Sequence, residues 1–353
     1  MKKDSTKTVV VVGMDLGDKD SQICGLEAEG GRVLEKKIRT SEKGIREAFG
    51  KLERCRVVLE AGGQSGWIAR LLGELGHEVK VVNPRKMRRI YENESKSDVV
   101  DARELADAGL YRWEKLPVVY LRERGIQEKL SVLRSRDALV RARTGLVNLV
   151  RSLLKQEGVK VPKVSSAAFA QKAAQLVPEG LVVAVKPLLG QIAELTDNII
   201  AMDRWIANKG KEEPEIQSVQ QVAGVGPVTA AAYVWTIGEA RRFGKSRAVG
   251  SYLGLRPRRD QSGETDKQLP ITKAGDAYLR RLLVGCAHYV LGPHGPKTAL
   301  KQWGEKLSER GGKRAKRKAV VGVARKLAVL LHHLWVTGEV YEPFPESSRR
   351  RAA

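Results

Sequence analysis

The sequence predicts an α/β domain at the N-terminus, a helical segment after it, and a mainly α-helical domain at the C-terminus. Short apolar runs that end at glycine or a charged residue dominate the first 85 residues, a pattern typical of buried strands. Apolar pairs then recur every seven residues, which indicates long helices. From Pro214 onward, glycine-rich turns precede further helical stretches. The domains are therefore expected at 1–115, 116–212 and 213–345, with a basic tail at 346–353.

The N-terminal domain is expected to contain five strands, two helices between them and a further helix that carries Asp98 and Asp101. Gly30 and Gly31 supply a hairpin turn between the second and third strands. Three antiparallel strands followed by an alternating α/β half match the layout of the RNase H-like fold, although the actin-like ATPase fold opens with the same order. The strands are expected at 8–15, 20–28, 31–39, 56–60 and 78–82, and the helices at 42–53 and 64–75.

Four carboxylates occupy informative positions in this domain. Asp15 and Glu60 end the first and fourth strands, which are neighbours in an RNase H-like sheet. Asp98 and Asp101 are three residues apart, so on a helix they share one face. Carboxylates in such a group can hold the two Mg²⁺ ions of phosphoryl transfer, and their oxygen ligands also suit Mn²⁺. We predict that all four are catalytic and bind metal. The simpler interpretations are a turn residue for Asp15, a surface charge for Glu60 and a helix N-cap for Asp98.

The charge and the cysteine content indicate which kind of partner the protein binds and in which cellular compartment it works. Lys and Arg number 64 against 41 Asp and Glu, a net charge of +23. Such a surplus favours a polyanionic partner, because neutralised phosphates release their counterions. Three scattered cysteines without a CxxC pair indicate neither a disulfide framework nor a zinc site. No run approaches the ~18 apolar residues of a membrane span, and no signal peptide is recognisable. We therefore expect nucleic acid as partner, no membrane association and a cytoplasmic location.

The segment 116–212 is expected to form a coiled coil or a long helical hairpin. Gly158 and Pro162 end the first helix, and a second helix at about 181–208 packs back on it. Two interpretations stay open: a bundle within one chain, and an arm for dimerisation. The heptad positions are occupied by Val132-Leu133, Leu139-Val140, Leu146-Val147 and Leu153-Leu154.

The C-terminal domain contains three candidate contacts with nucleic acid. A helix-hairpin-helix-like turn at 222–230 is glycine-rich, and the start of its second helix can hold a phosphate. A basic loop follows at 254–263, and a helix opens near residue 275. Residues 310–326 carry eight Lys or Arg and no acid. The predicted contact residues are Gly224, Gly226, Arg256, Arg258, Arg259, Lys273, Lys313, Arg314, Lys316, Arg317 and Lys318.

Several motifs, in order along nearly the whole chain, resemble the transposases of the insertion sequence 110 family. The N-terminal motifs are similar to the family's DEDD RuvC-like domain, and the others to its C-terminal serine transposase domain. The first set is Asp15-Leu-Gly17, the strand end at Glu60, Val82-Asn-Pro84 and Lys96–Ala102. The second set is Gly224–Ala230, Ser251–Pro257, Gln261–Gly263 and Ile271–Gly275.

The resemblance implies a site-specific DNA recombinase with a composite active site. In such enzymes the DEDD acids of one subunit bind Mg²⁺, and a serine of the C-terminal domain attacks DNA to form a transient phosphoserine. The composite site implies a dimer or tetramer, and a structured noncoding RNA encoded by the element selects the DNA. A prokaryotic, nucleoid-associated protein is expected.

By the family motif, the nucleophile falls on Ser262. A Ser-Gly pair in a polar loop exposes a hydroxyl, and Arg256, Arg258 and Arg259 are close enough in sequence to stabilise a pentavalent phosphate. Without the resemblance, the pair is simply a turn. Ser251 is the competing serine, but it lies in a stretch that is expected to be helical and structural.

Three other function classes account for parts of the sequence. A RuvC-like junction endonuclease would keep the acids and hydrolyse DNA with water. An actin-like ATPase would need a second phosphate loop, which the sequence lacks. A non-catalytic nucleic-acid scaffold would leave the four acids unexplained.

Overall fold

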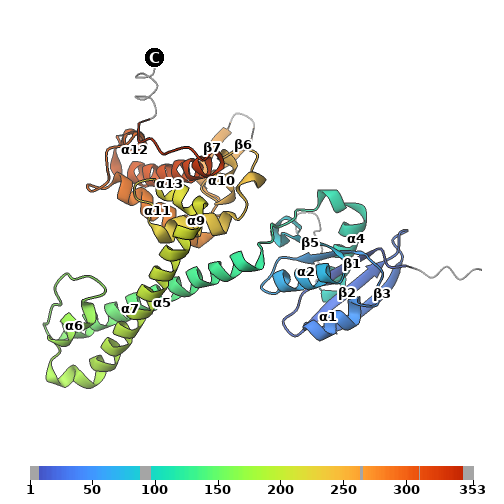
Figure 1. Ribbon diagram of the computed structural model, residues 1–353, viewed down its shortest axis with the longest axis horizontal. Helices are drawn as coiled ribbons and strands as arrows, with labels where there is room; N and C mark the ends of the chain where they lie inside the picture. The colour runs from blue at the N-terminus through green and yellow to red at the C-terminus, as the bar shows by residue number, and fades with distance from the viewer. Residues whose placement is uncertain (1–7, 88–96, 263–264, 310, 345–353) are drawn as a thin grey trace, which may run out of the picture. The chain divides into compact units, whose positions relative to one another are not determined.

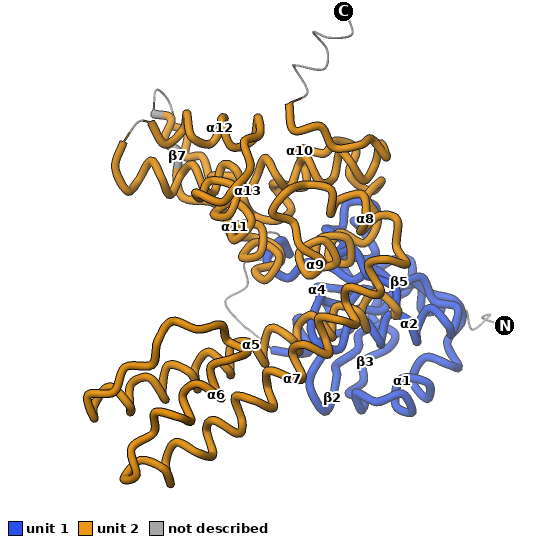
Figure 2. The backbone as a smooth tube through the Cα atoms, turned by 60° about the vertical axis from the view of Figure 1, so that its left-hand side comes forward, with its two compact units in different colours: residues 1–123 blue, residues 124–353 orange. Residues whose placement is uncertain are grey.

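The computed structural model describes residues 8–87, 97–262, 265–309 and 311–344 (Figure 1). The chain divides into two compact units, Met1–Glu123 and Arg124–Ala353, which are coloured separately in Figure 2. The predicted boundaries at residues 115, 212 and 345 define a finer division, which stays a prediction.

The first unit is built on a five-stranded sheet with the order β3-β2-β1-β4-β5. β1, β2 and β3 are antiparallel, whereas β4 runs parallel to β1 and β5 parallel to β4. Gly30, with φ +87°, makes the turn between β2 and β3. The mixed α/β prediction is confirmed, with element ends shifted by at most four residues. The strands are β1 Val11–Asp15, β2 Asp20–Leu26, β3 Arg32–Arg39, β4 Arg56–Glu60 and β5 Glu78–Val82.

Helices cover both faces of this sheet. Because strand side chains alternate between faces, Val12 and Leu59 belong to the core beneath α1 (Glu42–Phe49) and α2 (Ser65–Glu74). Val11 and Val58 belong to the clusters beneath α4 (Asp98–Tyr111) on the other face. The short helices α3 (Pro84–Met87) and η1 (Trp113–Lys115) complete the unit.

The second unit begins with two long helices, α5 (Arg124–Gln156) and α7 (Val182–Glu212). They are antiparallel, because Leu133 clusters with Ile206 near one end of the pair and Val150 clusters with Val185 near the other. The predicted long helix and its returning partner are confirmed, and the coiled-coil character stays a prediction. α6 (Phe169–Ala174) and η2 (Glu179–Leu181) lie between them in the chain.

The rest of this unit is mainly helical around one core. α9 is buried along nearly its whole length, and the Tyr233 hydroxyl donates a hydrogen bond of 2.6 Å to the Ala328 carbonyl on α13. The helices are α8 Pro214–Gln220, α9 Pro227–Ile237, η3 Ala240–Arg242, α10 Arg247–Tyr252, α11 Ala277–Leu291, α12 Ala299–Ser308 and α13 Gly312–Thr337; β6 Pro257–Ser262 and β7 Thr265–Ile271 form a hairpin.

α13 is long and apolar enough to cross a membrane by length and composition. However, one face of this helix packs into the protein core with α9 and α11, where Val323, Leu327 and Leu331 are fully buried. Its His332 is also buried and forms hydrogen bonds through both ring nitrogens, to Ser246 Oγ and the Ala240 carbonyl at 2.9 Å each. α13 is therefore a core helix.

Candidate functional site

Asp15 and Glu60 stand at the carboxyl ends of two adjacent parallel strands. The register pairs Met14 of β1 with Leu59 of β4, so the next residue on each strand is one of the two acids. Neighbouring strands are about 4.8 Å apart. By alternation, both acids lie on the same face as Gly13 and Val58, which is the face that α4 covers. The predicted adjacency of the first and fourth strands is confirmed.

The start of α4 reaches the same edge of the sheet. A Cβ on Gly13 would lie 2.0 Å from the Ala102 carbonyl oxygen, so helix and strand backbones are in direct contact there. Gly109, further along α4, approaches Val11 near the start of β1, so the helix runs antiparallel to the strand. Asp98 precedes Ala102 by about 6 Å of helix. Asp15 follows Gly13 by about 6.6 Å of strand. Both acids therefore stand at about the same level.

The cap of α4 separates the roles of Ser97 and Asp98. The Ser97 hydroxyl accepts the Val100 N–H at 3.3 Å and is the N-cap. The alternative that Asp98 serves as N-cap is therefore wrong, and its exposed carboxylate is not used for capping. A purely structural role also remains open for Asp98 and Asp101, because acidic residues in the first turn stabilise a helix by about 0.3–1 kcal/mol through interaction with the helix dipole.

The four acids share an edge and a face, but their side chains do not form a closed cage. Within the part of the chain that the structure describes, no three His, Cys, Asp or Glu side chains converge closely enough to hold a metal ion. The donor set fits a hard divalent cation such as Mg²⁺ or Mn²⁺, because all four residues offer carboxylate oxygens. Metal binding by this set stays a prediction.

Two residues that the sequence did not single out hold the loop after β1. Gln64, just before α2, donates from Nε2 to the Asp18 carbonyl at 3.2 Å. Thr40 donates its hydroxyl to the Gly17 carbonyl at 3.0 Å. Because Gln64 follows Glu60 by four residues, it ties the chain after β4 to the chain after β1. These contacts depend on tertiary structure, and no local pattern marks them.

Ser262 is exposed at the end of β6, opposite Thr265 of β7. The predicted basic loop is therefore wrong in part, since residues 257–262 form a strand. Nearly all side chains of Pro257–Ser262 face solvent. The stretch therefore has no alternation of apolar and polar residues from which a strand could be predicted. Gly263 lies outside the described residues. Ser251 is exposed on α10, which confirms the predicted helix.

The three arginines near Ser262 have different surroundings. Arg256 and Arg258 are exposed. Arg259 reaches across the hairpin and donates from Nε to Asp266 Oδ1 at 2.7 Å. This hydrogen bond raises the pKa of Arg259 and lowers the pKa of Asp266. A phosphate would therefore compete with Asp266 for Arg259, but not for the other two.

The base of the hairpin is fixed by backbone contacts. Gly254 (φ +68°) and Gly275 (φ +77°) bring two loops so close that a Cβ on either would lie 2.1 Å from a carbonyl oxygen of the other loop. Arg280, which prediction of the site missed, donates to the carbonyls of Leu253 at 3.0 Å and Ala274 at 2.9 Å. Lys273 has φ +55°, a left-handed conformation that is strained for a residue with a Cβ, and its side chain is exposed.

The remaining predicted contacts lie on two other surfaces of the same unit. Gly224 (φ +90°) bends the turn between α8 and α9, where a Cβ would lie 2.7 Å from Tyr289. Gly226 is the N-cap residue of α9 and, as a glycine, offers no side-chain hydrogen bond to the helix start. Gly224, Gly226 and Arg281 are among the residues that line a shallow pocket of about 610 Å³. Its identity as a helix-hairpin-helix motif stays a prediction. The five cations of α13 are all exposed: Lys313, Arg314, Lys316, Arg317 and Lys318.

Comparison with known proteins gives matches at both ends of the chain. Residues 12–158 match a family model described as "Transposase", and residues 216–303 match the model of the "Transposase IS116/IS110/IS902 family". A probable family 20 transposase of Pseudomonas aeruginosa is 30% identical over 94% of this chain and 98% of its own length. The transposase for insertion sequence element IS1111A of Coxiella burnetii is 26% identical over 96% and 92%, respectively.

These matches cover both compact units in the order that the sequence motifs predicted. They define the class of protein as a transposase of an insertion element. The chain belongs to the IS116/IS110/IS902 family of transposases, which confirms the resemblance found in the sequence.

Proposed function

We propose that this transposase cleaves and rejoins DNA strands of an insertion element through a metal-dependent acidic site and a serine nucleophile. Asp15, Glu60, Asp98 and Asp101 would hold Mg²⁺ or Mn²⁺, and Ser262 would attack the phosphate. The observation that carries the proposal is the meeting of two strand ends and one helix start at a single sheet edge, with acids at all three. A purely structural role for these acids would not require that shared edge.

Each group has a defined task in this reaction. Ser262 Oγ forms a bond to phosphorus as the bond from phosphorus to a deoxyribose oxygen breaks; the serine gives up its proton and the leaving oxygen takes one up. The exposed Arg256 and Arg258 would compensate negative charge on the phosphate. A bound divalent ion would supply Lewis-acid stabilisation of phosphate oxygens.

The acids and the serine belong to different compact units. The proposed active site is therefore assembled from both units, and the family resemblance implies that these come from different subunits of a dimer or tetramer. The net charge of +23 supports contact with DNA and with a structured RNA that is encoded by the element and selects target and donor. We place the protein in the cytoplasm, associated with the nucleoid.

The test is strand exchange on a plasmid that carries the element with its native flanks. Asp15→Ala, Glu60→Ala, Asp101→Ala and Ser262→Ala should each abolish exchange while binding of DNA persists. Ser251→Ala is the matched control, because it removes an exposed hydroxyl from α10 in the same unit. Exchange by Ser262→Ala at the normal rate would show that the serine is not the nucleophile.

A second candidate is a metal-dependent junction endonuclease that acts by hydrolysis. It is favoured by the fact that all four acids lie in one compact unit, so hydrolysis would require no residue of the other. The two candidates differ in their products. A covalent protein–DNA adduct on a nicked suicide substrate supports the serine reaction, whereas free 5′-phosphate ends without an adduct support hydrolysis.

A further inference from the structure

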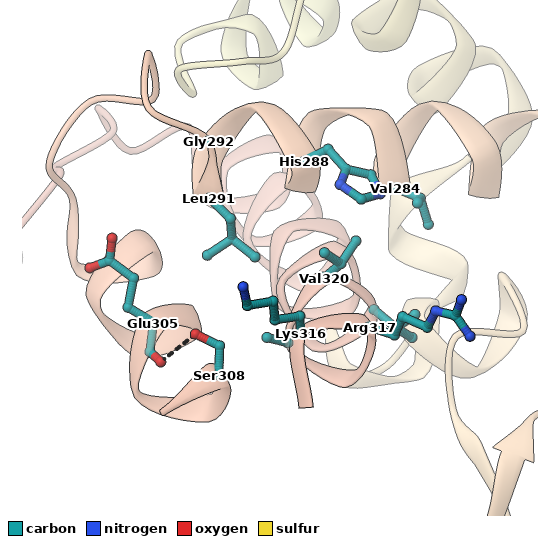
Figure 3. A pocket seen from close by; sticks show the side chains of 11 residues that line it. Val284, His288, Leu291, Gly292, Glu305, Ser308, Lys316, Arg317 and Val320 are labelled. Atoms are coloured by element: carbon teal, nitrogen blue, oxygen red, sulfur yellow. Dashed lines mark hydrogen bonds between the residues drawn. The ribbon is translucent and has the colours of Figure 1, made fainter. Parts of the chain in front are cut away.

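A pocket of about 700 Å³ lies between α11, α12 and the first turns of α13 (Figure 3). Part of its wall is aliphatic and only half-buried: Val284 and Leu291 from α11, and Val320 from α13. The imidazole of His288 borders the same space, and Lys316 extends into it from α13 (Figure 3). The pocket therefore combines a half-buried apolar wall with a flat ring and a cation.

The mouth of this pocket is strongly basic. Lys316 and Arg317 line it, and Lys313 lies one turn before them, so these three share one side of the helix. All are exposed, and the first turn of α13 contains no acid. Like charges at this spacing destabilise a helix, as do cations at its N-terminus. A bound polyanion would offset both effects. The acid in the lining, Glu305, comes from α12 on the opposite side.

We propose that this pocket receives one unpaired base of a single-stranded polynucleotide, while the adjoining phosphates contact Lys316 and Arg317. A base has apolar faces that pack on aliphatic groups and stack on an imidazole, and its backbone carries the negative charge that the mouth lacks. The volume lies within the 300–1,000 Å³ that is usual for ligand sites. Paired bases are held inside a duplex stack and cannot enter. The inference rests on the proposed action on nucleic acid and adds a preference for unpaired strands.

The test compares oligomers with equal phosphate charge and different bases. Fluorescence anisotropy would measure binding of the full chain to an oligodeoxyuridine about 12 nucleotides long, the matching abasic oligomer and the matching oligouridine, at about 150 mM salt. We expect the oligodeoxyuridine to bind at least about five-fold more tightly than its abasic counterpart. Tighter binding of oligouridine would identify RNA as the source of the base, and the reverse would identify DNA.

Two substitutions separate the pocket from the charges. Val320→Gln places a polar, uncharged side chain in the apolar wall. It should bring the ratio of the affinities for the oligodeoxyuridine and the abasic oligomer below about two-fold, without weakening binding of the abasic oligomer. Val336→Gln is the matched control, because Val336 is 43% exposed near the other end of the same helix. Lys316→Gln should weaken binding of both deoxy oligomers. It should also reduce the slope of the logarithm of the binding constant against the logarithm of salt concentration by about 0.7.

The outcomes separate the inference from the proposed function. Equal affinity for the base-containing and abasic oligomers, or an unchanged ratio in Val320→Gln, overturns the pocket and leaves the nucleic-acid function standing. Failure to bind any of these single-stranded oligomers while a DNA duplex of the same length still binds overturns the pocket alone. Failure to bind the duplex as well overturns both, because the charged surface would then have no polyanionic partner.

Discussion

The contact between Gly13 and α4 gives the sharpest test of how the acidic edge is assembled. In Gly13→Ala, the new methyl would lie 2.0 Å from the Ala102 carbonyl oxygen and 2.3 Å from the Ala106 nitrogen. Both are backbone atoms, so no side-chain rotation relieves the overlap, and α4 must retreat by about 1 Å or more. Since α4 carries Asp98 and Asp101, the same retreat moves two of the four acids.

Three glycine-to-alanine substitutions should form a graded series of stabilities. A methyl on Gly73 of α2 would have no atom within 4 Å, so alanine should stabilise the helix by up to about 1 kcal/mol. The Gly109 methyl would lie 2.7 Å from the side chains of Val11 and Val58, which are buried and stiff but less fixed than backbone, so a loss of about 2 kcal/mol is expected. Gly13→Ala should lose about 3 kcal/mol, the upper end of overpacking costs.

Thermal unfolding of the full chain, followed by circular dichroism, measures this order. At about 4 °C per kcal/mol, Gly13→Ala should melt about 12 °C below wild type and Gly73→Ala slightly above it. Where Gly13→Ala remains folded, strand exchange should fall about 100-fold, because a displacement of 1 Å costs that much in positioning. If Gly13→Ala melted within about 2 °C of wild type, α4 would not lie against β1 and the shared edge would be refuted.

Three further predictions concern the second unit and the thiols. Burial lowers the pKa of His332 below its usual 6.5, so the free energy of unfolding should fall as pH decreases through that value. His332→Gln should flatten this dependence in urea melts on either side of pH 6.5, and an unchanged slope would exclude the histidine as its cause. Burial raises the pKa of all three cysteine thiols, that of Cys55 to about 11. A disulfide reagent at mildly alkaline pH should therefore label no cysteine in the folded chain and all three in urea. Rapid labelling of the folded chain would contradict this. Asp203→Asn removes the ion-pair partner of Arg136 between α5 and α7 and should cost about 1 kcal/mol, whereas an unchanged melting temperature would mean that the pair adds nothing.

The N-terminal sheet was predictable because its strands are short, apolar and sharply ended. Val57–Glu60 illustrates this: three buried valine or leucine residues precede a carboxylate, so both the strand and the position of Glu60 follow from the local pattern. The spacing of Asp98 and Asp101 likewise indicates one helix face. The position of Asp98 and Asp101 at the sheet edge was harder to predict from the sequence. It depends on the close contact between Gly13 and α4, and a lone glycine in a strand is compatible with many neighbours.

The hairpin was less predictable for a physical reason. Strand prediction depends on side chains that alternate between core and solvent, and Arg258–Ser262 are all exposed. The pairing of Arg259 with Asp266 depends on the register of β6 and β7, and no apolar pattern in these strands specifies that register. The serine was therefore singled out by resemblance, and its strand context came only from the structure.

The exposure of β6 also has a consequence for variation and engineering. Because Arg258–Ser262 contribute nothing to the core, substitutions there should cost little folding stability. The loops at its base tolerate no such change, since Gly254 and Gly275 meet backbone to backbone. The stretch Arg258–Ser262 can thus be mutated extensively, labelled or chemically caged without unfolding its domain. Sequence differences along it among natural relatives would then report differences in the reaction, not adjustments of packing.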